Sequence, residues 1–95
     1  MLNAGKESAV HEMSLALEVC RIAEERVGPE GLPRLREVGL AVGLDSGVEP
    51  ECLEFWLETL LASPPFAGAR IVLEVGAGDD LRVTYLEVED GDPPH

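Results

Sequence analysis

The sequence predicts an α+β domain with two layers, in which two helices pack on one face of a small three-stranded sheet in the chain order α-β-α-β-β. Apolar residues recur at helical spacing in two segments, 10–27 and 50–62. They alternate or cluster at strand spacing in three shorter segments, 35–42, 70–75 and 81–88. Glycine and proline clusters separate these five segments, and 95 residues suffice for one domain.

The first helical segment is amphipathic. Charged residues fall mostly off its apolar line, which consists of Met13, Ala16, Leu17, Cys20, Ala23 and Val27. The pair Gly28-Pro29 ends the helix, because glycine adopts the capping conformation and proline cannot continue it.

The next strand and helix have two faces each. In residues 35–42 one face of the strand is small, with Gly39 and Ala41, which predicts that another group packs closely against it. Pro50 suits the first turn of the second helix. That helix is expected to bury Leu53, Trp56, Leu57, Leu60 and Leu61. Phe55 lies off this stripe and is a candidate contact for a partner or a second packing surface.

Residues 70–75 and 81–88 flank a short glycine- and aspartate-rich connection, 76–80, which is typical of a β-hairpin. The sequence thus divides into an N-terminal extension (1–9), a folded domain (10–89) and an acidic flexible tail (90–95). A three-stranded sheet leaves two edges, which could pair with another copy to give a homo-oligomer.

The charge and the missing motifs exclude several functions. A net charge of −12 argues against a nucleic-acid partner, which requires a basic surface. No apolar run reaches the length of a membrane span, and residues 1–10 do not resemble a secretory signal, so we expect a cytoplasmic protein. Ser14 and Ser46 have no histidine nearby in the sequence, and the glycine turns do not match a phosphate loop. We therefore expect no enzyme and no catalytic residues.

Zinc is also not expected. Cys20 and Cys52 lie far apart and form no CxxC pair, and the only conceivable ligand set adds His11 and His95 without suitable spacing. The two cysteines are expected to behave as small buried apolar residues in a reducing compartment.

Four stretches together resemble a known family. They are HEMSLALEV (11–19), VGLAVGLDSGVEPECLEFWLETL (38–60), ARIVLEV (69–75) and LRVTYLEVE (81–89). In this order they resemble the HypA/HybF family of bacterial nickel metallochaperones, which serve hydrogenase maturation. The resemblance implies a nickel-binding domain whose partners are a nickel-delivering maturation GTPase and the hydrogenase large subunit.

The sequence departs from this family at the connection 76–80. Family members carry a longer module there, with two CxxC pairs that bind zinc, whereas this chain has five residues. A hairpin turn would join the flanking strands without loss of pairing. The resemblance therefore implies the nickel-binding core without its zinc-binding module, and functions that depend on that module are in doubt.

The second departure concerns nickel. Family members begin Met-His-Glu and bind Ni(II) there, because a terminal amine, a backbone amide nitrogen and the imidazole of the second residue form a planar nitrogen chelate. Here the corresponding Val10, His11 and Glu12 follow nine other residues. Internal to the chain, His11 and Glu12 supply few ligands. Without the resemblance, these two residues would more simply be exposed positions at a helix start.

Val10 offers an explanation for this departure. A GUG codon is read as valine inside a gene and as methionine at a bacterial start, so initiation there would give Met-His-Glu. The only lysine, Lys6, and the only asparagine, Asn3, both lie in residues 1–9. The hypothesis is that these nine residues are a start-site artefact, and that Val10, His11 and Glu12 bind Ni(II). The alternative is a genuine extension on a metal-free protein-interaction module derived from the same family.

Overall fold

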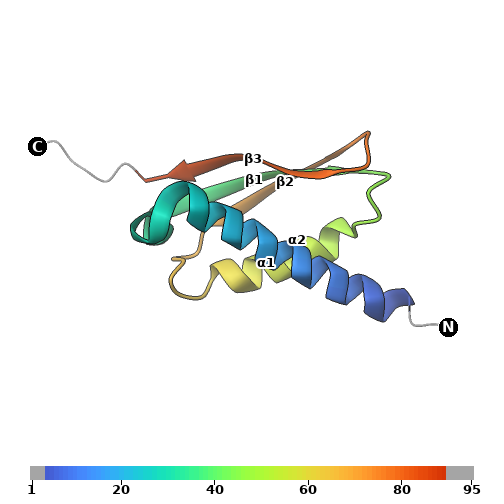
Figure 1. The fold of residues 1–95 in the computed structure, drawn as a ribbon, viewed down its shortest axis with the longest axis horizontal. Helices are drawn as coiled ribbons and strands as arrows, with labels where there is room; N and C mark the ends of the chain where they lie inside the picture. The colour runs from blue at the N-terminus through green and yellow to red at the C-terminus, as the bar shows by residue number, and fades with distance from the viewer. Residues whose placement is uncertain (1–3, 90–95) are drawn as a thin grey trace, which may run out of the picture.

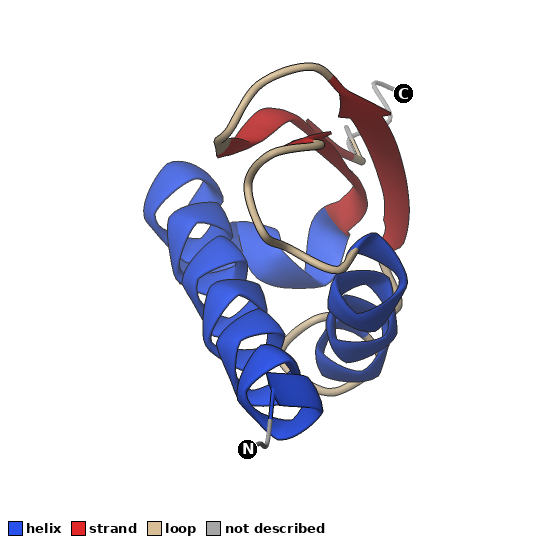
Figure 2. Ribbon diagram, turned by 90° about the vertical axis from the view of Figure 1, so that its right-hand side faces the viewer, coloured by secondary structure: helices blue, strands red, loops and turns tan. Residues whose placement is uncertain are grey.

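The computed structural model describes the backbone of residues 4–89 and the side chains of residues 11–89. Two helices cover one face of a three-stranded sheet, which confirms the predicted α+β class (Figures 1 and 2). The elements are α1 (Ala4–Gly31), a 3₁₀ turn η1 (Leu32–Arg34), β1 (Leu35–Gly43), α2 (Pro50–Leu61), β2 (Arg70–Gly76) and β3 (Leu81–Val88).

The order of strands in the sheet is β2-β1-β3, with β1 parallel to β2 and antiparallel to β3. The predicted hairpin is therefore wrong, because β2 and β3 lie on opposite sides of β1. Residues 77–80 instead cross the end of β1, as Figure 1 shows. Three backbone N–H groups donate to this crossing, from Gly43 to Asp80 O, Leu44 to Gly76 O and Asp45 to Gly78 O, at 2.7–2.8 Å.

Gly43 makes this crossing sterically acceptable. A β-carbon at Gly43 would lie 2.3 Å from the carbonyl oxygen of Gly78, a distance that real β-carbons do not show. The absence of a side chain lets the connection pass directly over the end of β1. The same glycine- and aspartate-rich composition that predicts a hairpin is thus used to cross a strand.

Helix α1 buries a line of residues rotated from the predicted one. Glu12, Ala16, Val19 and Ala23 are buried, whereas Leu17 has an exposed fraction of 51 %. The prediction that Leu17 is buried is wrong, and Val19 takes its place. The regular helix is interrupted at Gly28, where φ is +79°, as the Gly28-Pro29 pair predicts.

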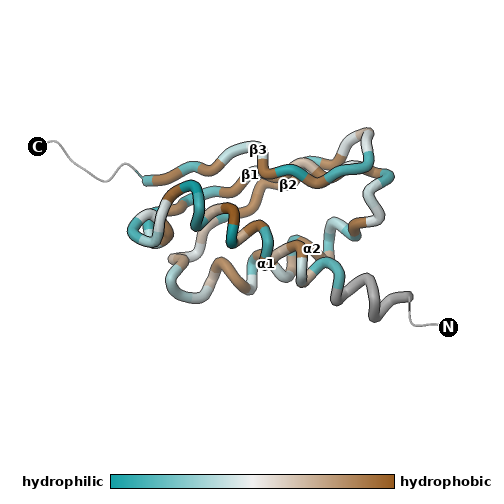
Figure 3. Tube along the Cα trace, in the orientation of Figure 1, coloured by the Kyte–Doolittle hydropathy of each residue, from teal (hydrophilic) through white to brown (hydrophobic). Residues whose placement is uncertain are grey.

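The core lies between the helices and the sheet (Figure 3). Helix α2 contributes Leu53, Leu57 and Leu61, all buried, and Trp56 and Leu60 pack against them, as expected. Phe55 has an exposed fraction of 59 %, and its ring meets that of Trp56 edge to face at a centroid distance of 5.5 Å. Its predicted place off the apolar stripe is confirmed.

The face of the sheet away from the helices also follows the prediction. Gly39 lies under the ring of Tyr85, since a β-carbon at Gly39 would be 2.2 Å from Tyr85 Cε2. The pairing of β1 with β3 shifts between Gly39 and Leu40, so Thr84 is bulged out of the ladder. Because of the bulge, Val83 and Tyr85 lie on opposite faces of the sheet, so the expected alternation of Leu81, Val83 and Tyr85 on one face is wrong at Tyr85.

Candidate functional site

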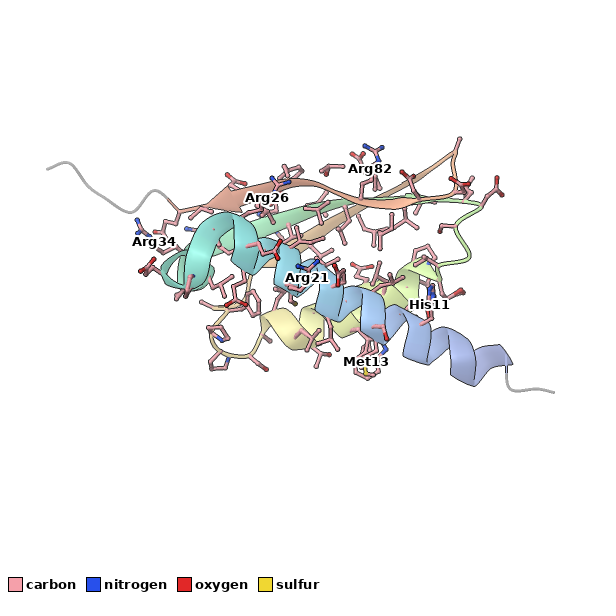
Figure 4. The ribbon with its side chains drawn as sticks, viewed as in Figure 1. His11, Met13, Arg21, Arg26, Arg34 and Arg82 are labelled. Atoms are coloured by element: carbon pink, nitrogen blue, oxygen red, sulfur yellow. The ribbon has the colours of Figure 1, made fainter. Side chains whose placement is uncertain are left out.

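The predicted nickel site lies on the N-terminal half of α1, beside the start of α2 (Figure 4). His11 is exposed, whereas Glu12 has an exposed fraction of 0 %. Successive residues of a helix point in directions about 100° apart, so adjacent side chains can meet different environments. The backbone of Val10 belongs to α1, and its side chain lies outside the described part.

Glu12 is held by the second helix. Its Oε2 atom accepts a hydrogen bond from the backbone N–H of Glu49 at 2.6 Å. Glu49 is the N-cap residue of α2 and makes no capping bond with its own side chain. The side chain of Glu12 therefore supplies the hydrogen-bond acceptor at the start of α2 that the side chain of Glu49 does not provide.

The sequence explains why Glu12 is buried. Glu12, Ala16, Val19 and Ala23 follow one another at steps of four, three and four residues, which places them on one helical face. The alanines are small, so the two helices can approach closely enough for the carboxylate to reach α2. The Oε1 atom of Glu12 is also buried and has no hydrogen-bond partner within the described residues.

The loop that leads into α2 fixes the position of Glu49. The Ser46 hydroxyl donates to Gly43 O at 2.7 Å and accepts from Val48 N–H at 3.2 Å. Gly47 adopts a φ of +81°, which favours glycine. Ser46 and Gly47 thus shape the turn that presents Glu49 to Glu12, a partner that sequence reasoning does not reveal.

His11 and Glu12 do not form a metal cluster with other side chains. Among residues 11–89, no three histidine, cysteine, aspartate or glutamate side chains lie close enough together to hold a metal ion. The backbone amides of residues 11 and 12 also lie beyond the first turn of α1, which begins at Ala4. They are therefore engaged in the helix rather than free for a chelate.

A helix that starts at residue 10 would no longer engage the backbone amides of residues 11 and 12. The first four N–H groups of any helix lack intrahelical partners, so the amides of residues 11 and 12 would be free. The amine of residue 10 would stand next to the imidazole of His11 in the chain. The donor set would then hold only nitrogens, which suits Ni(II) or Cu(II) in a planar geometry.

The cysteines do not add ligands to this site. Cys20 and Cys52 are free and half-buried, with Cys20 packed against the core. Burial raises the pKa of the Cys20 thiol to about 11, which keeps it protonated at neutral pH. A protonated thiol is a poor metal ligand, since cysteine binds metals as the thiolate. His95 of the sequence-based zinc set lies outside the described residues.

A second polar cluster lies on the outer face of the sheet. Glu37 accepts hydrogen bonds from the Tyr85 hydroxyl and from Arg70, whose Nη2 and Nε lie 3.2 and 3.3 Å from Glu37 Oε1. The bond from Tyr85, followed by the charge and hydrogen bond of Arg70, lowers the pKa of Glu37. The same bond raises the pKa of Tyr85. This cluster holds β1, β2 and β3 together on the face that no helix covers.

Within residues 4–89, no helix is both long enough and apolar enough to cross a membrane.

Comparison with known proteins identifies the family. Residues 10–80 match the family described as "Hydrogenase/urease nickel incorporation, metallochaperone, hypA". Three relatives carry the name hydrogenase maturation factor HypA. That of Moorella thermoacetica is 34 % identical over 65 residues, covering 68 % of this chain and 58 % of its own length. That of Chlorobaculum parvum is 37 % identical with the same coverage, and that of Syntrophus aciditrophicus is 29 % identical over 82 % of this chain and 75 % of its own length.

The chain thus spans less than three fifths of the length of the first two relatives. The family match nevertheless covers most of the chain, including α1 from residue 10 onward and all of β1, α2 and β2. It begins at Val10, so that His11 is the second matched residue. The resemblance found in the sequence is confirmed, and the chain belongs to the HypA family of nickel-incorporation metallochaperones.

Proposed function

We propose that this protein carries Ni(II) at the start of α1 and delivers it during the maturation of a nickel enzyme. Ni(II) is the cargo. The amine of residue 10, the backbone nitrogens of residues 11 and 12 and the imidazole of His11 hold it. The role requires a chain that begins at residue 10, as initiation at a GUG codon for Val10 would provide.

The observation that supports this proposal most directly is the position of the family match. The match begins at Val10, so His11 is the second matched residue. A histidine that is second in a chain can close a chelate with the terminal amine. No other described residues offer a competing site, because residues 11–89 contain no cluster of three potential metal-binding side chains.

Glu12 has a supporting part in this proposal. Its backbone nitrogen belongs to the chelate, while its carboxylate stays on the N–H of Glu49. The start of α1 is then docked against the start of α2, and the bound ion is held at the surface beside exposed His11. An exposed ion is accessible to a partner that must take it away.

The family description and the names of the relatives support a hydrogenase as the recipient. We propose that the recipient is a [NiFe]-hydrogenase large subunit, with a maturation GTPase as the second partner, and that transfer takes place in the cytoplasm. The family description also includes urease, which makes a urease the other nickel enzyme to test. The protein itself performs no catalysis in this scheme.

The full 95-residue chain favours a second function, a metal-free interaction module. In that chain α1 continues to Ala4, the amides of residues 11 and 12 are engaged, and Glu12 is buried away from exposed His11. Exposed Phe55 on α2 would then belong to the surface that contacts a partner.

Nickel titration separates the two functions. Two untagged proteins are compared, one beginning at residue 10 with methionine in place of Val10 and the other comprising all 95 residues. The nickel-carrier proposal predicts a planar Ni(II) absorption band and micromolar or tighter binding in the short protein only. His11→Ala should abolish this binding, and Ser14→Ala, a change at an exposed position of the same helix, should not. Equally weak binding by both proteins would favour the metal-free module.

N-terminal sequencing of the protein from its native host tests the start directly. A first residue at position 10 supports the carrier. A mature chain that retains residues 2–9 contradicts it.

A further inference from the structure

We infer that the free edge of β2 is an interface between two copies of this chain, paired antiparallel about a two-fold axis at Val72. The two edges of the sheet differ. β3 carries a bulge at Thr84, and bulges are one way in which proteins block pairing at an edge. β2 pairs with β1 over all seven of its residues without any shift, so its outer edge is regular and unprotected.

β2 carries apolar side chains on the face that the helices cover and two charges of opposite sign on the other face. Ile71, Leu73 and Val75 share the covered face, whereas Val72 lies between Arg70 and Glu74 on the outer face. Within the described residues, no strand pairs with the outer edge of β2. A regular edge of this kind is a template for a further strand whose charges complement its own.

The register of a symmetric pair can be derived from the strand itself. Residues opposite each other in an antiparallel pair share a face, and a two-fold axis places one residue opposite its own copy. With Val72 on the axis, Ile71 lies opposite Leu73 on the face that the helices cover. Arg70 then lies opposite Glu74 on the outer face, so both apolar and charged residues are matched.

The charged residues are available for this pairing. The side chain of Arg70 has an exposed fraction of 77 %, and Glu74 is exposed. Arg70 uses Nε and Nη2 to bond Oε1 of Glu37, which leaves other guanidinium N–H groups for a second carboxylate. Because of the two-fold symmetry, the Arg70–Glu74 pair occurs twice in the interface.

The structure also leaves room at the end of the strand. A hollow of about 870 Å³ begins at Gly68, Arg70 and Ile71 and extends across β1 to Glu87 and Val88 of β3. In the antiparallel arrangement the far end of the second strand lies beside the β2 side of this hollow.

Two features weaken the dimer. The first is electrostatic repulsion between the copies, because each carries a net charge of −12 and Glu58 of α2 adds a negative charge beside the hollow. Two seven-residue strands also bury less surface than a standard interface. We expect a dissociation constant roughly between 1 µM and 1 mM, which falls as salt screens the repulsion between the copies.

Sedimentation equilibrium of the 95-residue protein over roughly this concentration range, at low and high salt, tests the inference. The expected result is a monomer–dimer equilibrium that shifts toward dimer at high salt. A protein that stays monomeric throughout at both salt concentrations would overturn the inference.

Charge exchange identifies the interface. Glu74→Arg places arginines opposite arginines, and Arg70→Glu places glutamates opposite glutamates, so each variant should dimerise roughly tenfold or more weakly than the parent. A mixture of the two variants restores opposite charges and should form a heterodimer. Glu24→Arg is the matched control, because it makes the same change at an exposed position of α1. Circular dichroism establishes that each variant is folded. An equal loss of dimer in Glu24→Arg and Glu74→Arg, or no recovery on mixing, would contradict this interface.

Discussion

The carboxylate of Glu12 accepts a hydrogen bond from the backbone N–H of Glu49 at 2.6 Å, which joins the N-terminal half of α1 to the start of α2 across 37 residues of sequence. The contact turns the glutamate of the His-Glu pair into a structural residue. His11 beside it stays exposed, so one position of the pair holds the helix and the other faces solvent.

Glu12→Ala should lower the free energy of unfolding by about 1–3 kcal/mol, because it leaves the N–H of Glu49 without its acceptor and creates a cavity. Glu12→Gln keeps an acceptor oxygen of similar shape and should cost less than about 1 kcal/mol. Urea denaturation followed by Trp56 fluorescence measures both values. Equal losses in the two variants would show that the hydrogen bond is not what stabilises this contact.

Gly39→Ala should be destabilising by about 1–3 kcal/mol, because its β-carbon would meet the Tyr85 ring at 2.2 Å and displace it from Glu37. Shortening Tyr85 to alanine removes the ring, so Gly39→Ala should cost much less in the Tyr85→Ala background. A double-mutant cycle measured by urea denaturation gives this difference. Additive costs would mean that the two residues do not interact as described.

Because the connection 76–80 crosses over the end of β1, alanine substitutions at Gly43 and at Gly76 should differ in their effect on stability. Gly43→Ala should cost more than about 2 kcal/mol, because its β-carbon would lie 2.3 Å from the backbone oxygen of Gly78, which cannot rotate away. Gly76→Ala is the control, since no atom lies within 4 Å of its β-carbon position, and it should change stability by less than about 0.5 kcal/mol. Thermal unfolding compares them. A larger effect at Gly76 would contradict the crossing.

The hydrogen bond between Tyr85 and Glu37 predicts a pH dependence. Because the folded state lowers the pKa of Glu37, the stabilisation is present above the ordinary carboxyl pKa and is lost as the pH falls through the lowered value. Tyr85→Phe removes the largest cause of this shift, so the pKa of Glu37 should rise and stability should fall less on acidification. NMR titration of the Glu37 carboxyl measures the change. An unchanged pKa in Tyr85→Phe would rule out the bond as its cause.

The Cys20 thiol, whose pKa burial raises to about 11, should react slowly with iodoacetamide at pH 8. In a Cys52→Ser variant the rate should rise about tenfold per pH unit from pH 8 to pH 10, because the thiolate fraction does so below the pKa. Mass spectrometry of the alkylated protein follows the reaction. A rate that levels off near pH 9 would show that Cys20 is not buried as described.

The fold could be predicted from the sequence where local pattern decides it. The bounds of β1, α2 and β3 follow the apolar spacing and the glycine and proline positions closely. The small face at Gly39 indicates that another group packs against it, although not that this group is the Tyr85 ring. Pairing between strands could not be predicted. A short glycine-rich connection serves equally to turn a hairpin or to cross the end of a strand, and only the position of β1 distinguishes them.

The sequence puts His11 and Glu12 next to each other in the candidate site but does not indicate that one side chain is exposed and the other buried. The burial of Glu12 could have been found, because it continues the line of Ala16, Val19 and Ala23, but a carboxylate on an apolar face is unexpected without its partner. That partner is a backbone N–H of α2, and backbone groups leave no mark in a sequence. Leu17 is exposed because the buried line of α1 passes from Ala16 through Val19 to Ala23.

The central claim, that a terminal amine beside His11 makes this protein a nickel carrier, is tested most directly by acetylation. The protein that begins at residue 10 is prepared with a free and with an acetylated amine, and each is titrated with Ni(II) by calorimetry at pH 7.5. Acetylation leaves His11 and Glu12 unchanged and removes only the amine. The nickel-carrier account predicts tight binding to the free amine and a loss of at least roughly a hundredfold in affinity, about 2.7 kcal/mol, after acetylation. Equal affinity in the two forms would contradict it.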